Sequence, residues 1–396
     1  MSRKPEALNL FLVAGEPSGD QLGGKLIAAM GKISDRPLHM SGVGGDAMAE
    51  QGCSSLFPLS EIAVMGPIAI LKQLRMIVRR VHQTVDAIVD MDPDALVILD
   101  SPEFTHAVAK RVRRRLPDLP VIDYVSPSIW AWRPGRAKKM RRYVDHVLAI
   151  LPFEPDAHQR LGGPECTYVG HPLIEQVEWI KGLDTERLRT TLNLASNKPL
   201  IAVLPGSRTS EIKRMMPVYG DTVDRIIKHT GPVDVLMPIV SDTEELIRQE
   251  LKNWVVTPHL LLGDDKKFTA FRLADAALAT SGTVTLELAL AGTPMVVGYR
   301  VDFLVDLFSW LFRAHSVVLP NLILGENIFP EFIQGDCTPD ALSKAILPLL
   351  DIKSPERRAQ IKALEGIEKR MRLSNGVPSQ KAAEIVLRQT QSAKTN

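Results

Sequence analysis

The sequence predicts an α/β protein with two Rossmann-like domains, each a doubly wound parallel sheet, that face each other across a cleft. Three observations lead to this fold class. The chain has 396 residues, which is more than one hydrophobic core usually serves. Short apolar runs alternate with amphipathic segments from end to end. This alternation pauses near residues 170–182 and then starts again.

Five apolar runs in the first half have the length and composition of buried strands. They are Leu8–Ala14, Leu38–Val43, Ala95–Leu99, Val121–Val125 and His146–Leu151. Helical patterns between them include Gln21–Met30, Pro67–His82 and Thr105–Arg115. Because strand and helix patterns alternate, the connections are βα crossovers and the predicted sheet is parallel.

The second half repeats this order. Its expected strands are Leu200–Leu204, Val233–Met237, His259–Leu262, Ala276–Ala279 and Met295–Tyr299. We place the first domain at residues 1–172 and the second at 173–350, with the boundary near Gly170–Gly182. Residues 351–396 are charged and helical in pattern, with a break at Asn375–Pro378.

The composition is typical of a soluble globular protein, with 45% hydrophobic and 24% charged residues and a formal net charge of +2. Cys53, Cys166 and Cys337 are isolated and odd in number, which favours free thiols over disulfides or a zinc site. The first apolar run is too short for a secretory signal, and no apolar stretch reaches the length of a membrane span. We therefore expect a cytoplasmic protein that holds no metal.

Two strands of the second half run into loops that suit a phosphate group. These loops contain Gly206, Ser207 and Arg208, and Ser281, Gly282 and Thr283. A helical pattern follows each loop, so backbone N–H groups and the positive end of a helix would face the ligand. Arg208 adds a planar set of donors for a diphosphate, and Glu287, one turn into the second helix, is placed to bind ribose hydroxyls. These features predict half of a nucleotide-sugar site.

Two strand ends in the first half carry candidate groups. Asp100 follows Ala95–Leu99, where a carboxylate is costly to bury without a partner or a task. We take Asp100 as the candidate general base for a sugar hydroxyl, with helix capping as the alternative. The loop after Leu8–Ala14 holds Ser18, Gly19 and Asp20, for which ligand binding and helix capping are equally good interpretations.

Basic and apolar segments indicate an anionic partner. Six cations and no acid lie in residues 133–142, which suits a solvated helix face, an anionic lipid surface or a phosphorylated substrate. No nucleic-acid recognition fold accompanies them, so we do not expect a nucleic-acid partner. Pro67–His82 fits either an interfacial amphipathic helix or a helix packed on its own sheet. Phe303–Phe312 is a second apolar segment, for a membrane surface or for the core.

Six motifs occur in the order of a known family. They are Ala14–Asp20, Ser126–Trp132, Val169–Pro172, Leu204–Arg208 with Glu211, Ser281–Thr283 with Glu287, and Pro320–Asn321. Together they resemble the lipid-A-disaccharide synthase family, inverting glycosyltransferases of the GT-B type, through about residue 375. Pro17 departs from the family pattern, which has a small or hydroxylated residue there. That departure changes the stiffness of the loop and leaves the chemistry standing.

The resemblance implies a reaction without a cofactor. UDP-2,3-diacylglucosamine would donate its sugar to 2,3-diacylglucosamine 1-phosphate, giving a β-1,6-linked disaccharide and UDP. Ser18, Gly19, Glu211 and Asn321 join the expected substrate contacts, and Asp20 becomes the second candidate base after Asp100. The family also implies peripheral binding to the cytoplasmic face of the inner membrane. Its C-terminal helix would return to the first domain, either its own or that of a partner in a homodimer.

Two other functions fit the same two-domain fold. A UDP-N-acetylglucosamine 2-epimerase would share the UDP half-site, but it would not need the acid-free amphipathic segment. A nucleotide-sugar sensor would keep Arg208 and Glu287 and have no use for Asp100. Turnover of a soluble UDP-sugar without an acceptor selects the epimerase, whereas UDP binding without turnover selects the sensor.

Overall fold

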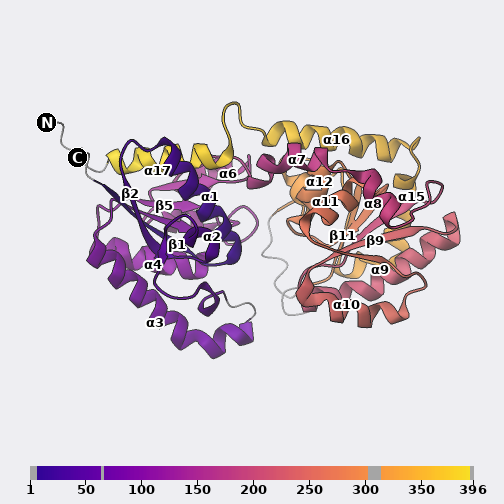
Figure 1. The fold of residues 1–396 in the computed structure, drawn as a ribbon, viewed down its shortest axis with the longest axis horizontal. Helices are drawn as coiled ribbons and strands as arrows, with labels where there is room; N and C mark the ends of the chain where they lie inside the picture. The colour runs from indigo at the N-terminus through magenta and orange to yellow at the C-terminus, as the bar shows by residue number, and fades with distance from the viewer. Residues whose placement is uncertain (1–6, 64–66, 302–313, 393–396) are drawn as a thin grey trace. The chain divides into compact units, whose positions relative to one another are not determined.

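The computed structural model describes residues 7–63, 67–301 and 314–392. The chain forms two compact units (Figure 1). The first comprises the described residues up to Pro172 and those from Leu373 onward, and the second comprises Leu173–Arg372. Each unit contains one parallel sheet with helices on both faces, which confirms the predicted α/β class with two Rossmann-like domains.

The first unit alternates strands and helices almost from its start. Its strands are β1 (Leu8–Ala14), β2 (Leu38–Val43), β3 (Ser54–Ser55), β4 (Ala95–Leu99), β5 (Val121–Tyr124), β6 (His146–Ala149) and β7 (Glu165–Tyr168). Its α-helices are α1 (Pro17–Ile33), α2 (Asp46–Ala49), α3 (Pro67–Met91), α4 (Pro102–Arg115), α5 (Gly135–Met140), α6 (Glu154–Leu161) and α17 (Pro378–Ser392).

The strand order of the first sheet is β3-β2-β1-β4-β5-β6-β7, and all the pairs are parallel. Strand order therefore reverses between β1 and β4. In an open parallel sheet, ligands bind at the carboxyl ends of the strands where the order reverses. The loops that begin at Gly15 and Asp100 lie at this point, and the Gly15 N–H donates to the Leu99 carbonyl at 3.3 Å.

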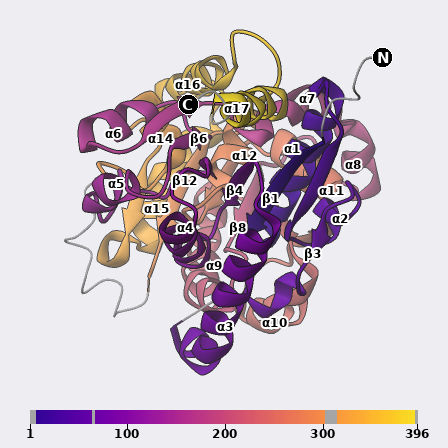
Figure 2. The same cartoon turned by 90° about the vertical axis from the view of Figure 1, so that its left-hand side faces the viewer.

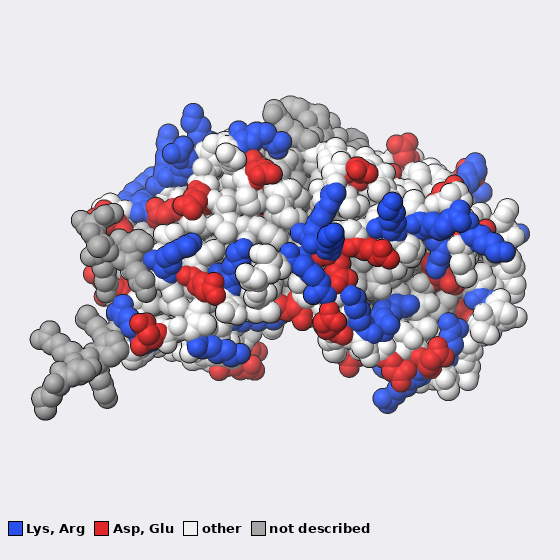
Figure 3. Space-filling view, turned by 90° about the horizontal axis from the view of Figure 1, so that it is seen from above, with Lys and Arg blue, Asp and Glu red and all other residues white. Residues whose placement is uncertain are grey.

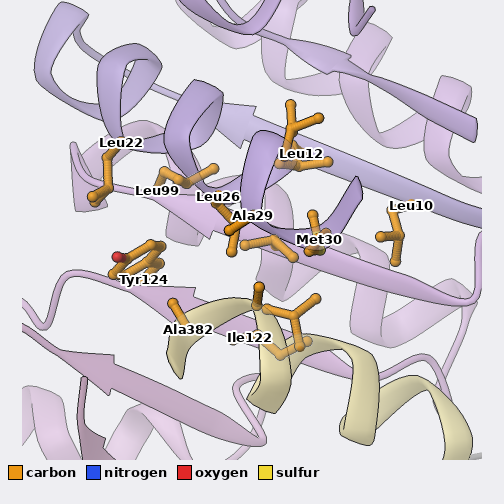
Figure 4. Close-up of a cluster of buried hydrophobic side chains, with 14 of the residues drawn as sticks. Leu10, Leu12, Leu22, Leu26, Ala29, Met30, Leu99, Ile122, Tyr124 and Ala382 are labelled. Atoms are coloured by element: carbon orange, nitrogen blue, oxygen red, sulfur yellow. The ribbon is translucent and has the colours of Figure 1, made fainter. Parts of the chain in front are cut away.

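Alternate residues of these strands pack into two cores on opposite faces of the sheet. The helices that cover these faces are seen in Figure 2. One layer contains α1 and α17, and the other contains α3, α4 and α5. Figure 4 shows the first of these cores, with side chains from β1, β4 and β5 meeting α1 and α17. The labelled residues are Leu10, Leu12, Leu22, Leu26, Ala29, Met30, Leu99, Ile122, Tyr124 and Ala382. The last helix of the chain is thus an integral part of the first unit.

The second unit contains a six-stranded sheet. Its strands are β8 (Leu200–Leu204), β9 (Asp234–Ile239), β10 (His259–Leu262), β11 (Ala276–Ala279), β12 (Met295–Tyr299) and β13 (Glu331–Ile333). Its α-helices are α7 (Val177–Gly182), α8 (Thr185–Thr191), α9 (Thr209–Thr230), α10 (Glu244–Glu250), α11 (Asp264–Leu273), α12 (Val284–Ala291), α14 (Leu319–Leu324), α15 (Pro339–Leu350) and α16 (Pro355–Met371).

This sheet has the order β10-β9-β8-β11-β12-β13, so its order reverses between β8 and β11. Helices α9 and α15 pack on one face, and α8 and α11 pack on the other. The Thr280 N–H donates to the Leu204 carbonyl at 3.0 Å, which joins the ends of β8 and β11. The two loops that the sequence singled out for a phosphate therefore begin at the reversal point.

The C-terminal segment, expected from residue 351 onward, divides between the units. Helix α16 belongs to the second unit, and only residues from Leu373 belong to the first. Three short strands were not anticipated, namely β3, β7 and β13. The apolar segment Phe303–Phe312 lies outside the described residues. Among the residues that are described, no helix is both long and apolar enough to cross a membrane.

Candidate functional site

The loop between β8 and α9 is held in shape by Glu211, at the third position of the helix. Its Oε2 accepts long hydrogen bonds from the backbone N–H groups of Ser207 at 3.3 Å and Arg208 at 3.4 Å. Gly206 has φ +107°, and a Cβ there would lie 2.6 Å from the same Oε2, so only glycine fits. Glu211 was expected to contact substrate. In the structure its carboxylate holds its own loop, and Glu211 also lines the cavity described below, so its contact with substrate stays a prediction.

Arg208 is the N-cap residue of α9 and lines a cavity in the second unit. Its Nη1 donates to Glu211 Oε1 at 3.0 Å, yet 62% of the side chain stays exposed. A guanidinium has five N–H donors, so this single pairing leaves most of them for an anion. The positive end of the 22-residue helix α9 lies beside it. Arg208 and the start of α9 can therefore bind a phosphate oxygen together.

The loop between β11 and α12 forms the other wall of this cavity. Ser281, Gly282, Thr283 and Glu287 all line it. The Ser281 hydroxyl donates to the Val317 carbonyl at 2.8 Å, which fixes the loop and leaves the hydroxyl oxygen as an acceptor. Thr283 is the N-cap of α12, and no side chain caps this helix. The N–H groups of Thr285 and Leu286 donate to the carbonyls of Gly282 and Thr283, so the donors that this turn can offer a ligand are the N–H groups of Thr283 and Val284, for which the described residues show no bond.

Glu287 lies in the first turn of α12 and is paired with a lysine. Its Oε1 is 3.2 Å from Lys267 Nζ, and only 17% of its side chain is exposed. Burial raises the pKa of Glu287, and the nearby Lys267 ammonium opposes that rise. Lys267 is also 3.0 Å from Asp264 Oδ1. Asp264 and Lys267 line the cavity, and the sequence analysis did not single them out.

The cavity has a volume of about 760 Å³, within the range of pockets that hold small ligands. Its walls come from the carboxyl ends of four neighbouring strands, β8, β9, β10 and β11. The contributions of β9 and β10 are Pro238–Ser241 and Leu262–Asp264, respectively. Arg208 and Glu287 reach it from opposite sides of the β8/β11 junction. The second unit thus presents one pocket for a ligand with both anionic and hydroxyl groups.

Asp100 stands at the equivalent reversal point of the first unit. Its Oδ2 accepts from the Ser18 hydroxyl at 2.5 Å, and its Oδ1 accepts from the Ser101 N–H at 2.8 Å. Asp100 has φ +57° and Ser101 has φ +39°, a conformation that costs energy for residues other than glycine. Gly19 lets α1 approach, since a Cβ there would lie 3.3 Å from Asp100 Cβ. The structure therefore brings Ser18, Gly19 and Asp100 together.

Asp20 does not join this group. Its carboxylate is 5% exposed and accepts three backbone N–H groups, from Gly45 at 2.7 Å and from Ala47 and Met48 at 3.0 Å. These bonds hold the start of α2. Because Asp20 is buried and its oxygens already accept these bonds, a substrate hydroxyl has poor access to it, and we do not keep it as a candidate base.

Asn321 also has a role within the fold. It is fully buried, and its amide donates to the Phe329 carbonyl at 2.9 Å and accepts from the N–H groups of Ile328 and Phe329 at 3.0 Å. These contacts hold the chain between α14 and β13. Asn321 does not line the cavity, so we leave it out of the nucleotide site.

The tryptophan-containing loop after β5 is fastened to α6 by a buried acid. Trp130 Nε1 donates to Glu154 Oε1 at 3.2 Å, and the Leu151 N–H donates to Oε2 at 3.0 Å. Burial raises the pKa of Glu154 to about 7.

Part of the basic cluster of residues 133–142 is paired within the fold. Arg136 and Arg133 lie 2.5 and 3.9 Å from Glu103. In the described residues, no three His, Cys, Asp or Glu side chains converge as a metal site would require.

Two Rossmann-like units with ligand loops at the strand-order reversals place the protein in the GT-B class. Its fold is similar to a UDP-GlcNAc 2-epimerase from Neisseria meningitidis, with a TM-score of 0.61 and 13% identity over 98% of this chain and 100% of that one. It is also similar to the glycotransferase of kitacinnamycin, with a TM-score of 0.62 and 16% identity over 97% and 99% of the two chains. At these identities the likeness concerns the fold alone.

Sequence comparison gives the family. The lipid-A-disaccharide synthetase family model matches residues 10–387. A lipid-A-disaccharide synthase of Nitrobacter hamburgensis is 48% identical over 382 residues, which is 96% of this chain and 94% of the relative. The chain therefore belongs to the lipid-A-disaccharide synthetase family, and the resemblance noted from its motifs is confirmed.

Proposed function

We propose that this chain transfers the sugar of UDP-2,3-diacylglucosamine to the 6-hydroxyl of 2,3-diacylglucosamine 1-phosphate, releasing UDP. The second unit binds the nucleotide, and Asp100 of the first unit acts as the base. The family match over residues 10–387, together with a pocket that suits a nucleotide diphosphate, is the observation that carries the proposal. The fold alone would serve an epimerase equally well.

The diphosphate binds between Arg208 and the starts of α9 and α12. Arg208 supplies charge-assisted hydrogen bonds, and the two helix ends supply backbone N–H groups. As the bond between the sugar and the diphosphate breaks, negative charge grows on the leaving UDP. Donors that are already fixed in place stabilise this charge without reorganising, which is the largest catalytic contribution in many enzymes.

Asp100 accepts the proton of the acceptor's 6-hydroxyl. Oxygen O6 then forms a bond to the anomeric carbon, and the bond from that carbon to UDP breaks with its electron pair leaving on the diphosphate. Attack from the opposite face inverts the configuration and gives the β-linkage. Hydrogen bonds from Ser18 and the Ser101 N–H orient the carboxylate and leave lone pairs free for the hydroxyl.

The direct test is to incubate the purified chain with both acylated substrates and to follow the disaccharide 1-phosphate by mass spectrometry and UDP by chromatography. Equal amounts of both products support the proposal. Conversion of UDP-GlcNAc without an acceptor, or UDP binding with no disaccharide formed, contradicts it.

Arg208→Ala tests the nucleotide pocket. We expect UDP affinity to fall by about 1.5–3 kcal/mol, because a hydrogen bond to a charged group is lost. Lys213→Ala is the matched control, since Lys213 is an exposed cation on the same helix and does not line the cavity. Calorimetric titration with UDP measures both variants. Equal affinity of Arg208→Ala and the control would remove Arg208 from the site.

We also propose that α3 attaches the protein to an anionic membrane surface. Leu74 and Val78 are exposed, at 47% and 43%, with the exposed Arg75 and Arg79 beside them. Elsewhere the helix serves the fold, since Val81 is buried in the core and Arg80 pairs with Glu61 at 2.5 Å. An apolar strip flanked by cations suits the interface of an anionic bilayer.

The charge on other surfaces supports this choice of helix. On the side of the first unit that carries α17, basic and acidic side chains are interspersed (Figure 3). Helix α17 packs on the opposite face of the first sheet from α3. This mixed surface around α17 offers less attraction to an anionic surface than the acid-free stretch from Ile62 to Val85.

A further inference from the structure

Lys267 connects two carboxylates in the nucleotide pocket. Its ammonium nitrogen is 3.2 Å from Glu287 Oε1 and 3.0 Å from Asp264 Oδ1. Lys267 and Asp264 belong to α11, whereas Glu287 belongs to α12. The lysine therefore connects the start of α11, which follows β10, to the start of α12, which follows β11.

The surroundings of Lys267 make this tie stiff. Its ammonium lies 4.5 Å from the centre of the Phe268 ring, and three-quarters of its side chain is buried. Phe268 and Phe271 anchor α11 in the interior, with 1% and 0% exposure. These aromatic side chains fix α11, and the contacts with Asp264, Glu287 and the Phe268 ring hold Lys267 Nζ in place.

Glu287 depends on this contact. Its carboxylate is largely buried, and burial without a positive partner disfavours the charged form. Of the two oxygens of Glu287, Lys267 contacts only Oε1. In the described part of the chain, no hydrogen bond or ion pair uses Glu287 Oε2, and Glu287 lines the cavity. One oxygen is thus anchored to α11 while the other remains an acceptor for a ligand.

We infer that Lys267 is a positioning residue that holds Glu287 as a hydrogen-bond acceptor for the ribose of the nucleotide and so makes the pocket selective for ribonucleotides. This inference rests on the proposed function of the same pocket. A ribose offers two adjacent hydroxyl donors, and a fixed carboxylate oxygen accepts from them more strongly than a neutral group does. A site built on such hydrogen bonds rejects an analogue that lacks the hydroxyl, since the carboxylate is then left unpaired.

Calorimetric titration of the full chain with UDP, 2′-deoxy-UDP and 3′-deoxy-UDP tests the inference. We expect the wild-type chain to bind UDP about tenfold or more tightly than at least one of the deoxy analogues. Lys267→Met should reduce this ratio to less than about threefold, mainly by weakening UDP. Lys267→Arg should restore it, because a guanidinium can reach both carboxylates. Lys266→Met is the matched control, as Lys266 is exposed and does not line the cavity.

Kinetics provide a second readout. Lys267→Met should raise the donor KM and leave kcat within about threefold, because the ribose contact forms in the ground state and the transition state alike. An unchanged ratio of UDP to deoxy-UDP affinities in Lys267→Met, or no discrimination by the wild-type chain, overturns the inference. A wild-type chain that does not bind UDP at all overturns the proposed function itself.

Discussion

Asp100 and Asp20 illustrate how much surroundings decide the role of a carboxylate. Both follow a strand or begin a helix at the same edge of the first sheet, and both were candidate bases from the sequence. Asp100 is partly exposed and accepts from Ser18 and its neighbour's N–H, in a strained backbone conformation. Asp20 is buried with three backbone donors. Only Asp100 keeps the accessibility that proton transfer needs.

Asp100→Asn should therefore lower kcat by about 10²–10⁴-fold, because the amide cannot take the proton of the acceptor hydroxyl. UDP affinity should stay near the wild-type value, since the nucleotide contacts belong to the second unit. Turnover at saturating substrate and calorimetric UDP binding are the two measurements. Retention of more than about a tenth of wild-type kcat would assign the base elsewhere.

The residues that line the candidate pocket were only partly predictable from sequence. Arg208 and Glu287 follow strands at the β8/β11 junction, and strand-end position with residue chemistry was enough to select them. Lys267 was missed because its partner Glu287 is twenty residues away, in a different helix. The same limit applies to Asn321, whose amide is consumed by backbone groups that only the folded chain brings near.

At the scale of elements, buried strands were easier to recognise than edge strands. Apolar runs such as Ala95–Leu99 and Leu200–Leu204 are fully buried in the middle of their sheets, and the structure has them with the expected bounds. The edge strands β7 and β13 are half-exposed and carry polar residues, so no apolar run marks them. Helix α1 begins at Pro17 rather than near Gln21, because proline is favoured in a first turn.

The three hydrogen bonds that Asp20 accepts at the start of α2 lead to a prediction about stability. Asp20→Asn should lower the free energy of unfolding by about 1–3 kcal/mol, since an amide has only one acceptor oxygen for three buried N–H groups. Urea denaturation at neutral pH measures this loss. Under conditions where the variant is fully folded, kcat should stay close to wild type. A loss of kcat with unchanged stability would return Asp20 to the list of candidate bases.

Glu154, which connects the tryptophan-containing loop to α6, should make the stability of the fold depend on pH. The pKa of Glu154 is raised from 4.5 to about 7 by burial, so between these values the folded chain holds a proton that the unfolded chain releases. This group therefore makes the folded state less stable as pH rises from about 4.5 to 7, and its cost is complete above that range. The buried His158 and His171, with pKa values lowered to about 4, act in the opposite direction between pH 4 and 6.5.

Glu154→Gln isolates the acid, because the histidines contribute to both proteins alike. We expect the stability of the variant relative to wild type to increase between pH 5 and pH 8, by up to about 3 kcal/mol. Urea denaturation of the two proteins across this pH range gives the difference directly. If the difference does not change with pH, Glu154 keeps an ordinary pKa in the folded chain.

For the whole molecule, the chemistry of the family's lipid substrates must be reconciled with a chain that lacks a spanning helix in its described part. Acylated sugars partition into bilayers, so an enzyme that acts on them would gain from attachment to the membrane surface. Helix α3 offers the exposed combination of leucine, valine and arginine that such a contact needs. A weak, salt-sensitive attachment would let the protein find substrates in the bilayer and leave again.

The double variant Arg75→Gln with Arg79→Gln should bind anionic vesicles about ten- to thirtyfold more weakly than wild type, because each cation near such a surface contributes about 1 kcal/mol. Sedimentation with vesicles containing phosphatidylglycerol, at low and high salt, measures the effect, and neutral vesicles show how much binding is apolar. Arg358→Gln with Lys362→Gln is the matched control, because it removes two exposed cations at the same spacing from α16. Both double variants remove the same charge, so a general electrostatic effect would weaken them equally. Equal loss in the two, or full binding by the α3 variant, would exclude α3 as the membrane surface.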